Sequence, residues 1–367
     1  MKQCTGLSHE EQVSMALQGL YEQNGYGRYK MGKFEEYDLY ARNKDFLVSD
    51  NIITFTENGR LMALKPDITL SIVRGSRDVP GQVQKLYYNE TVYRVSGNTD
   101  NFSEIMQVGL ECIGSIDTYC IAEVLILAAK SLKEISDECS LVLSNTGIVS
   151  SFLSAVALTP EEREQALILI GRKSSHELAS LLQAAHAPES AASALLRLVK
   201  LHGAPDTVIP ELEHLGCGFN ELSRLRALAS ALDAAGCGDM ISLDFSVVNN
   251  MRYYNGVVFK GYVSEVPVSV LSGGQYDRLM QKMGRTSGAI GFAVYLDTIK
   301  YLNRGTPEYD VDTVLLYGED QSPAEIYAAA EVLRRDGSVT VTAKLPASLR
   351  CRRVMKFDGR SVVPYDA

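Results

Sequence analysis

The sequence predicts a mixed α+β fold in which helices flank a mainly antiparallel sheet, with a helical insertion and a small α/β unit at the end. Two strand-like runs, Ile52–Thr56 and Arg60–Leu64, flank the turn Glu57-Asn58-Gly59, a pattern typical of an antiparallel hairpin. Residues 151–240 contain 17 leucines, 16 alanines and no tyrosine, which indicates a separate helical segment. From residue 311 strand and helix patterns alternate, as in a small α/β unit.

The first helix is predicted to start at Ser8. Ser8 and Glu11 form a capping box ahead of an apolar stripe, and Gly25 is suited to end the helix. Beyond the hairpin, further strand-like runs lie at Lys85–Tyr88, Thr91–Val95 and Ser103–Ile113. The short connections favour antiparallel neighbours, because parallel strands need long crossovers.

The helical segment carries its own start signals, Thr159-Pro160 with Glu162 and then Pro188. Strand patterns return after it at Met240–Val248, Val257–Val263 and Val266–Leu271. The stretch Ile290–Leu302 is predicted to be a buried strand that enters a helix.

The end of the chain is predicted to hold strands at Val311–Tyr317, Val339–Ala343 and Arg353–Phe357, with a helix between Ser322-Pro323 and Gly337. We therefore expect four parts. Residues 1–148 and 237–305 form a discontinuous core, residues 149–236 are a helical insertion, and residues 306–367 are the small α/β unit.

Composition excludes several classes of protein. With 46% hydrophobic and 22% charged residues, the chain is not disordered. It has no apolar run of 18 residues and no signal-peptide core, so we expect a cytoplasmic protein without membrane association. The net charge of −9 argues against a nucleic-acid surface.

Common cofactor and metal motifs are absent from the sequence. The seven cysteines include no C-x-x-C pair, and no phosphate loop, dinucleotide-binding glycine motif or H-E-x-x-H occurs. We therefore expect neither a metal site nor a cofactor.

One strand-like run carries polar residues in an unusual place. In Ile105–Ile113, Gln107, Gly109 and Glu111 share one face, because side chains alternate along a strand. The glycine leaves a notch between an amide and a carboxylate that is suited to a small polar ligand. The alternative is a half-exposed strand with an ordinary polar outer face.

Three further segments allow a ligand site or ordinary turn chemistry. Asp67 and Thr69 share one face of a short run after Pro66. Tyr253 and Tyr254 precede an Asn-Gly turn, where they bind a ligand or pack in a hairpin. The glycines of Leu271-Ser-Gly-Gly-Gln-Tyr-Asp277 permit either close approach to a ligand or a tight turn.

Taken in order, these segments resemble the catalytic core of class II histidyl-tRNA synthetases. Leu64-Lys-Pro-Asp-Ile-Thr69 is similar to that family's L-R-P-[ED]-x-T, and Val92-Tyr-Arg94 through Glu111 to its second motif. Tyr253-Tyr254-Asn-Gly256 resembles its histidine loop, and Gly291-Phe-Ala-Val-Tyr-Leu-Asp297 its third motif, G-F-A-x-G-L-E-R. Residues 306–367 resemble a truncated form of the family's anticodon-binding domain.

The departures from this pattern concern charge. In the synthetases the third-motif arginine holds ATP phosphates, and Thr298 stands in its place here. The arginine of the histidine loop is replaced by Asn249. The residues between Arg94 and Gln107 include no Lys or Arg but contain Asp100 and Glu104. Loss of two preorganised charges implies loss of aminoacyl-adenylate chemistry.

This combination resembles the regulatory subunits of ATP phosphoribosyltransferase, synthetase-like paralogues that act in the first step of histidine biosynthesis. The resemblance implies no catalytic residues, a short-form catalytic subunit as partner, a homodimer within a hetero-oligomer, histidine as effector and no tRNA. It implies a histidine site made of Asp67, Thr69, Arg94, Gln107, Glu111, Tyr253 and Tyr254. The alternatives are a divergent histidine-activating enzyme (a tRNA synthetase or amino-acid ligase) and a scaffold with a vestigial pocket.

Overall fold

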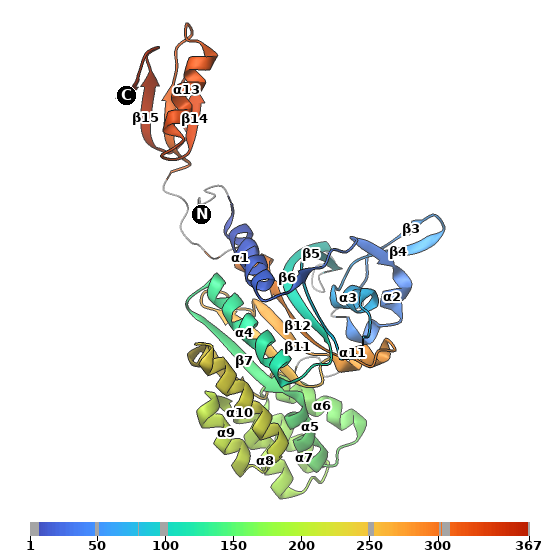
Figure 1. The fold of residues 1–367 in the computed structure, drawn as a ribbon. Helices are drawn as coiled ribbons and strands as arrows, with labels where there is room; N and C mark the ends of the chain where they lie inside the picture. The colour runs from blue at the N-terminus through green and yellow to red at the C-terminus, as the bar shows by residue number, and fades with distance from the viewer. Residues whose placement is uncertain are drawn as a thin grey trace. The chain divides into compact units, whose positions relative to one another are not determined.

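The computed structural model describes residues 7–47, 51–79, 81–95, 102–248, 253–300, 302 and 309–365. The chain divides into two compact units (Figure 1). The larger spans residues 8–302, and the smaller contains residues 309–365.

A nine-stranded sheet forms the centre of the larger unit, in the order β1-β5-β6-β12-β11-β10-β7-β9-β8. The strands are β1 Gly27–Arg28, β5 Val83–Val95, β6 Phe102–Gly114, β7 Cys139–Asn145, β8 His202–Gly203, β9 Ile241–Asp244, β10 Val257–Val263, β11 Leu271–Gln275 and β12 Gly288–Tyr295. The neighbours from β5 to β7 are antiparallel, whereas β1 runs parallel to β5 and β9 to β7. The predicted antiparallel core is confirmed.

Two helices, α1 (His9–Gln23) and α4 (Thr118–Ile135), cover one face of this sheet (Figure 1). The predicted capping box is confirmed, because Ser8 and Glu11 exchange both capping hydrogen bonds at the start of α1. The apolar stripe of α1 is buried against the sheet side chains that point to this face. These contacts form the main hydrophobic core.

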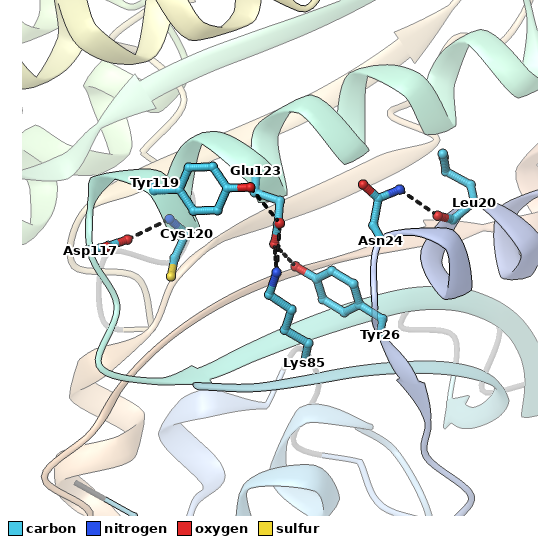
Figure 2. Close-up of polar contacts among 8 residues, drawn as sticks. All are labelled: Leu20, Asn24, Tyr26, Lys85, Asp117, Tyr119, Cys120 and Glu123. Atoms are coloured by element: carbon cyan, nitrogen blue, oxygen red, sulfur yellow. Dashed lines mark hydrogen bonds and ion pairs between the residues drawn. The ribbon is translucent and has the colours of Figure 1, made fainter. Parts of the chain in front are cut away.

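A polar cluster holds the start of α4 over strand β5 (Figure 2). The Glu123 carboxylate is 2.7 Å from the Lys85 ammonium and accepts hydrogen bonds from the Tyr26 hydroxyl at 3.1 Å and the Tyr119 hydroxyl at 3.3 Å. Asp117 caps the same helix by accepting from the Cys120 amide at 2.8 Å. One carboxylate thus joins the helix, strand β5 and the segment before β1.

The opposite face of the sheet carries a second buried cluster and most of the shorter elements. These are the three-stranded sheet β2 (Phe34–Glu36), β4 (Arg60–Leu64) and β3 (Thr54–Glu57), the helices α2 (Tyr37–Ala41), α3 (Thr69–Gly75) and α11 (Asp277–Lys282), and the 3₁₀ turn Lys44–Phe46. The short helix α12 (Leu296–Ile299) packs instead into the main core on the α1 side. The predicted hairpin is confirmed, and Asn58 and Gly59 both adopt positive φ in its turn. The cluster on this face is rich in tyrosine.

The leucine- and alanine-rich segment is helical, as predicted. It contains α5 Thr146–Ala155, α6 Pro160–Gly171, α7 Ser175–Ala184, α8 Glu189–Lys200, α9 Pro205–His214 and α10 Phe219–Ala234, and the 3₁₀ turn Gly238–Met240 follows. Thr159 and Glu162 form a capping box with Pro160 at the first position of α6. Its buried leucines join the main core, so this segment belongs to the same compact unit as the sheet.

Three strand predictions need correction. The runs predicted at Lys85–Tyr88 and Thr91–Val95 are one strand, because β6 pairs with β5 along its whole length. The strand predicted at Val266–Leu271 lies instead at β11. The glycines of β11, which we treated as a possible turn, pair with β10 and β12 on both sides. Long-range pairing outweighs the low strand propensity of glycine here.

The smaller unit is an α/β arrangement, as predicted. Strands β13 Val311–Leu316, β14 Val339–Thr342, β15 Cys351–Phe357 and β16 Val362–Pro364 form a sheet in the order β14-β13-β15-β16. Helix α13 (Pro323–Leu333) packs on one face through a small apolar cluster. Strand β16 was not predicted. Within the described parts of the chain, no helix is long and apolar enough to cross a membrane.

The fold contains a buried cation just before the segment Pro66-Asp67. The Lys65 side chain is fully buried, and its ammonium lies 2.9 Å from the carboxylate of Glu90, whose side chain is 18% exposed. Glu90→Gln leaves this cation without an anionic partner, so we expect a loss of about 3 kcal/mol in the free energy of unfolding. Urea denaturation followed by circular dichroism measures the loss.

The matched control is Glu211→Gln, which breaks the ion pair between Glu211 and Arg197. Both of these side chains are exposed. We expect that variant to lose no more than about 1 kcal/mol. Equal losses in the two variants would show that the burial of Lys65 does not matter for stability.

Candidate functional site

A cavity opens on the tyrosine-rich face of the large sheet. Its volume is about 80 Å³, several times what one water molecule needs. It is lined by Phe46, Asp67, Ile68, Thr69, Tyr88, Arg94, Gln107, Glu111, Tyr253, Tyr254, Ser272, Tyr276, Gly291, Phe292, Ala293 and Tyr295. All seven residues predicted to form a ligand site are among them.

The floor of the cavity consists of three rows of side chains across neighbouring strands. Pairing between β6 and β12 sets Gln107 opposite Tyr295, Gly109 opposite Ala293, and Glu111 opposite Gly291. Pairing between β12 and β11 extends the middle row to Ser272. The first and third rows are four residues apart, about 13 Å along a strand. The floor is therefore a shallow trough with polar ends and a middle row of small residues.

Glycines in the trough are required by the side chains beside them. A Cβ atom at Gly291 would overlap the Glu111 carboxylate, and one at Gly109 would overlap the Tyr88 ring 2.7 Å away and the Phe292 carbonyl oxygen. The notch predicted at Gly109 is thus occupied in part by Tyr88. The alternative of a half-exposed strand is wrong, since Gln107 is 4% exposed and Glu111 is 2% exposed.

Glu111 is the centre of the hydrogen-bond network at one end of the trough. One carboxylate oxygen accepts from the Thr69 hydroxyl at 2.9 Å, and the other accepts from the Tyr276 hydroxyl at 2.5 Å. Burial raises the pKa of Glu111 to about 8, although both hydrogen bonds oppose the shift. This carboxyl therefore exchanges a proton near neutral pH.

Asp67 and Arg94 lie beside the trough with opposite charges. The Asp67 carboxylate accepts from the Leu70 amide at 2.8 Å at the start of α3, so the predicted turn chemistry is present as well. Burial raises the pKa of Asp67, while the Leu70 amide and the Arg94 guanidinium oppose that shift. Arg94 is oriented by a 3.1 Å hydrogen bond from its Nε to the Pro66 carbonyl.

Aromatic side chains form the wall of the cavity. Tyr253 packs against Tyr254 with ring centroids 4.7 Å apart, against Tyr276 at 5.8 Å and against Phe46 at 5.9 Å. Gly274 lets the ring of Tyr254 lie against β11, because a Cβ there would come within 2.7 Å of it. The wall is rigid, apolar in its ring faces and polar in its hydroxyl groups.

Several cavity residues were not predicted from the sequence. Tyr276 lies within the segment Leu271–Asp277 that we singled out for its glycines, so its position was a usable signal. Tyr295 shares the strand face of Gly291, and alternation along β12 would have placed it there once the strand pairing was known. Ser272 lies in the same segment, whereas nothing local in the sequence marks Tyr88.

The positions at which charge was predicted to be lost are only partly described. The Thr298 hydroxyl donates to the carbonyl of Tyr295, the residue before the short helix α12, at 2.6 Å. Glu104 is an exposed residue of β6. Asn249 and Asp100 lie outside the described residues.

The arrangement is suited to binding a small zwitterion that also carries donors. Two carboxyl groups, one guanidinium and several hydroxyl groups face a volume too small for a large ligand. In the ranges that the structure describes, no three His, Cys, Asp or Glu side chains are grouped so as to hold a metal ion. Carboxylates and amide oxygens accept from an ammonium group, and a guanidinium pairs with a carboxylate.

Comparison with known proteins gives one consistent picture. The model of the histidyl-tRNA synthetase family matches residues 6–299. An ATP phosphoribosyltransferase regulatory subunit from Clostridium kluyveri is 30% identical over 89% of this chain and 87% of its own length. A second such subunit, from Alkaliphilus metalliredigens, is 26% identical over 94% of this chain and 90% of its own.

Solved structures share the fold. A Bacillus halodurans protein described as an ATP phosphoribosyltransferase regulatory subunit/histidyl-tRNA synthetase matches with a TM-score of 0.75 at 23% identity, over 91% of this chain and 88% of its own. Histidyl-tRNA synthetase from Nostoc sp. PCC 7120 matches with a TM-score of 0.76 at 15% identity, over 92% of this chain and 83% of its own. A chain of the ATP phosphoribosyl transferase (HisG:HisZ) complex from Thermotoga maritima matches with a TM-score of 0.63 at 17% identity, over 78% of this chain and 97% of its own.

The raised pKa of the buried Glu111 carboxyl predicts how folding stability depends on pH. In the unfolded chain its pKa is about 4.5, but in the folded protein the pKa is about 8, so folding stability is lost as pH rises through that window. Within this window, each pH unit lowers the free energy of unfolding by up to about 1.4 kcal/mol. Glu111→Gln removes this contribution, so between pH 5 and 8 the variant should lose less stability than the wild type.

Urea denaturation midpoints of the two proteins across this pH range, without ligand, are the measurement. Parallel curves for wild type and variant would show that Glu111 ionises in the folded protein as it does in the unfolded chain.

Proposed function

This chain belongs to the family of ATP phosphoribosyltransferase regulatory subunits, and from this premise we propose that it binds a short-form catalytic subunit and senses histidine in the trough around Glu111. Its role is regulatory, acting in the first step of histidine biosynthesis. The observation that carries the proposal is the convergence of all seven predicted residues on one cavity.

Histidine is complementary to the trough at both ends. Its imidazole fits the Glu111 end, where the carboxyl accepts from a ring N–H when ionised and donates to a bare ring nitrogen when protonated. A carboxylate has more than two acceptor positions, so Glu111 keeps its bonds to Thr69 and Tyr276 in the complex. Tyr253 and Tyr254 supply ring faces and hydroxyl groups beside the imidazole.

The other end of the trough suits the α-carbon substituents of histidine. Asp67 and Gln107 accept from the ammonium group, and the Arg94 guanidinium attracts the carboxylate. The free amino acid therefore matches the charges of the cavity one by one. A ligand without the ammonium group would leave the Asp67 carboxyl without a cationic partner.

We also propose that the chain neither activates histidine nor binds tRNA. Thr298 occupies the place of an arginine in the resembling third motif, and its hydroxyl is engaged with the Tyr295 carbonyl. A hydroxyl cannot neutralise phosphate charge as a guanidinium does. The alternative, a divergent histidine-activating enzyme, requires a cation at this place.

A homodimer within the complex is part of the proposal. The segment Glu35–Tyr40, which spans the end of β2 and most of α2, is similar to the dimer-forming first motif of the synthetases. Beside it, Phe34 and Phe55 form an exposed aromatic pair with ring centroids 5.5 Å apart. Large exposed apolar side chains in contact with one another favour burial against a partner.

The first test of the proposal is reconstitution with a short-form catalytic subunit from the same source. We expect the two chains to co-elute in gel filtration, and we expect phosphoribosyl transfer to rise at least tenfold over that of the catalytic subunit alone. Light scattering should give the isolated chain twice the 40.3 kDa of one copy. Separate elution at micromolar concentrations with an unchanged rate would contradict the partner assignment.

The second test is calorimetric titration of the isolated chain with L-histidine. At about pH 8.5, where the Glu111 carboxyl is mostly ionised, we expect binding by the wild type and at least tenfold weaker binding by Glu111→Gln, because a hydrogen bond to a charged group contributes about 1.5–3 kcal/mol. Glu213→Gln, on the exposed face of α9, is the matched control and should bind like the wild type.

Histidine-dependent exchange of pyrophosphate into ATP separates the remaining possibilities. Binding without exchange supports the regulatory role. Exchange well above background would favour the activating enzyme, and no binding at millimolar histidine would favour a scaffold with a vestigial pocket.

A further inference from the structure

Tyr295 stands at the end of the trough opposite Glu111. It is the last residue of β12, it pairs with Gln107 in the first row of the floor, and α12 begins at the next residue. Its side chain lines the cavity, whereas the next residues on the same face of β12 are Ala293 and Gly291. The floor is thus made of small residues except at this end, where a large aromatic ring closes it.

The surroundings of Tyr295 hold its side chain in the cavity. Burial raises the pKa of Tyr295 and of Tyr254, and the nearby Ser272 hydroxyl opposes the shift in both. The Tyr295 amide donates to the Val270 carbonyl at 2.8 Å, which fixes the backbone. Glu90 pairs with Gln107, and Arg94 lies four residues farther along β5 and lines the same cavity, so the ring lies at the guanidinium end of the trough.

The resembling third motif has a glycine where this chain has Tyr295. A glycine at this register position would leave the first row open next to Gln107, and the trough would continue past the guanidinium. The tyrosine ring fills that space instead. This difference concerns size and not charge, so it is independent of the loss of arginine at position 298.

We propose that Tyr295 determines the ligand specificity of the pocket, because its ring blocks the space beyond the carboxylate of a bound amino acid. The pocket then accepts a free amino acid and excludes amino acids whose carboxyl group carries a bulky substituent, such as amides, esters and acyl phosphates. The inference rests on the proposed histidine site. It adds to that site the side chain that limits the length of the ligand.

The test compares L-histidine with two carboxamide derivatives that differ from each other only in the size of the amide substituent, L-histidinamide and L-histidine β-naphthylamide. Both lack the carboxylate, so the loss of its attraction to Arg94 is the same in the two. Calorimetric titrations are made with the full-length wild type and with Tyr295→Gly, Tyr295→Ala and Tyr295→Phe. Tyr295→Phe keeps the ring and is the matched control.

We expect no measurable binding of the naphthylamide to the wild type or to Tyr295→Phe, and at least a tenfold gain in affinity for it in Tyr295→Gly or Tyr295→Ala. Retained binding of L-histidine shows that a variant is folded. Two small replacements are used so that the test still stands if one of them fails to fold. Naphthylamide binding by the wild type, or no gain in a folded small variant, overturns the inference. Failure of the wild type to bind L-histidine contradicts the proposed function itself and the inference with it.

Discussion

The structure of the candidate site depends on keeping one carboxyl group, that of Glu111, buried within the large sheet. Two hydroxyl groups make this possible, and they come from different elements: Thr69 begins α3, and Tyr276 lies between β11 and α11. Gly291 supplies the space, because any side chain there would overlap the carboxylate. The requirement to satisfy one buried acid therefore draws three distant segments of the chain together.

In the account proposed here, the cavity around Glu111 binds an amino acid and does not activate it. The cavity retains groups that match an amino acid, while the Thr298 hydroxyl bonds to the Tyr295 carbonyl and the Tyr295 ring fills the end of the trough opposite Glu111. A buried acid whose pKa is raised to about 8 matches the imidazole of histidine in either protonation state. Such a pocket holds its ligand reversibly, which is what a sensor requires.

Much of this was predictable from the sequence, because local patterns carry the relevant signals. Alternation along a strand placed Gln107, Gly109 and Glu111 on one face, and the capping boxes at Ser8 and Thr159 marked helix starts. Tyr295 was missed for a physical reason. Its place beside Gln107 depends on pairing between strands that lie far apart in the chain, and no local pattern encodes that register. Strand β11 was misjudged for the same reason, since its glycines are extended only because strands flank them on both sides.

The central claim is that histidine acts on the complex through the trough around Glu111. The most direct measurement is the histidine concentration that half-inhibits phosphoribosyl transfer by the reconstituted complex, with wild-type and with Glu111→Gln regulatory subunits. At about pH 8.5, where Glu111 is mostly ionised, the account predicts a midpoint at least tenfold higher with the variant, in line with the loss of a hydrogen bond to a charged group. The same midpoint in both complexes would contradict it, because histidine would then act at another site.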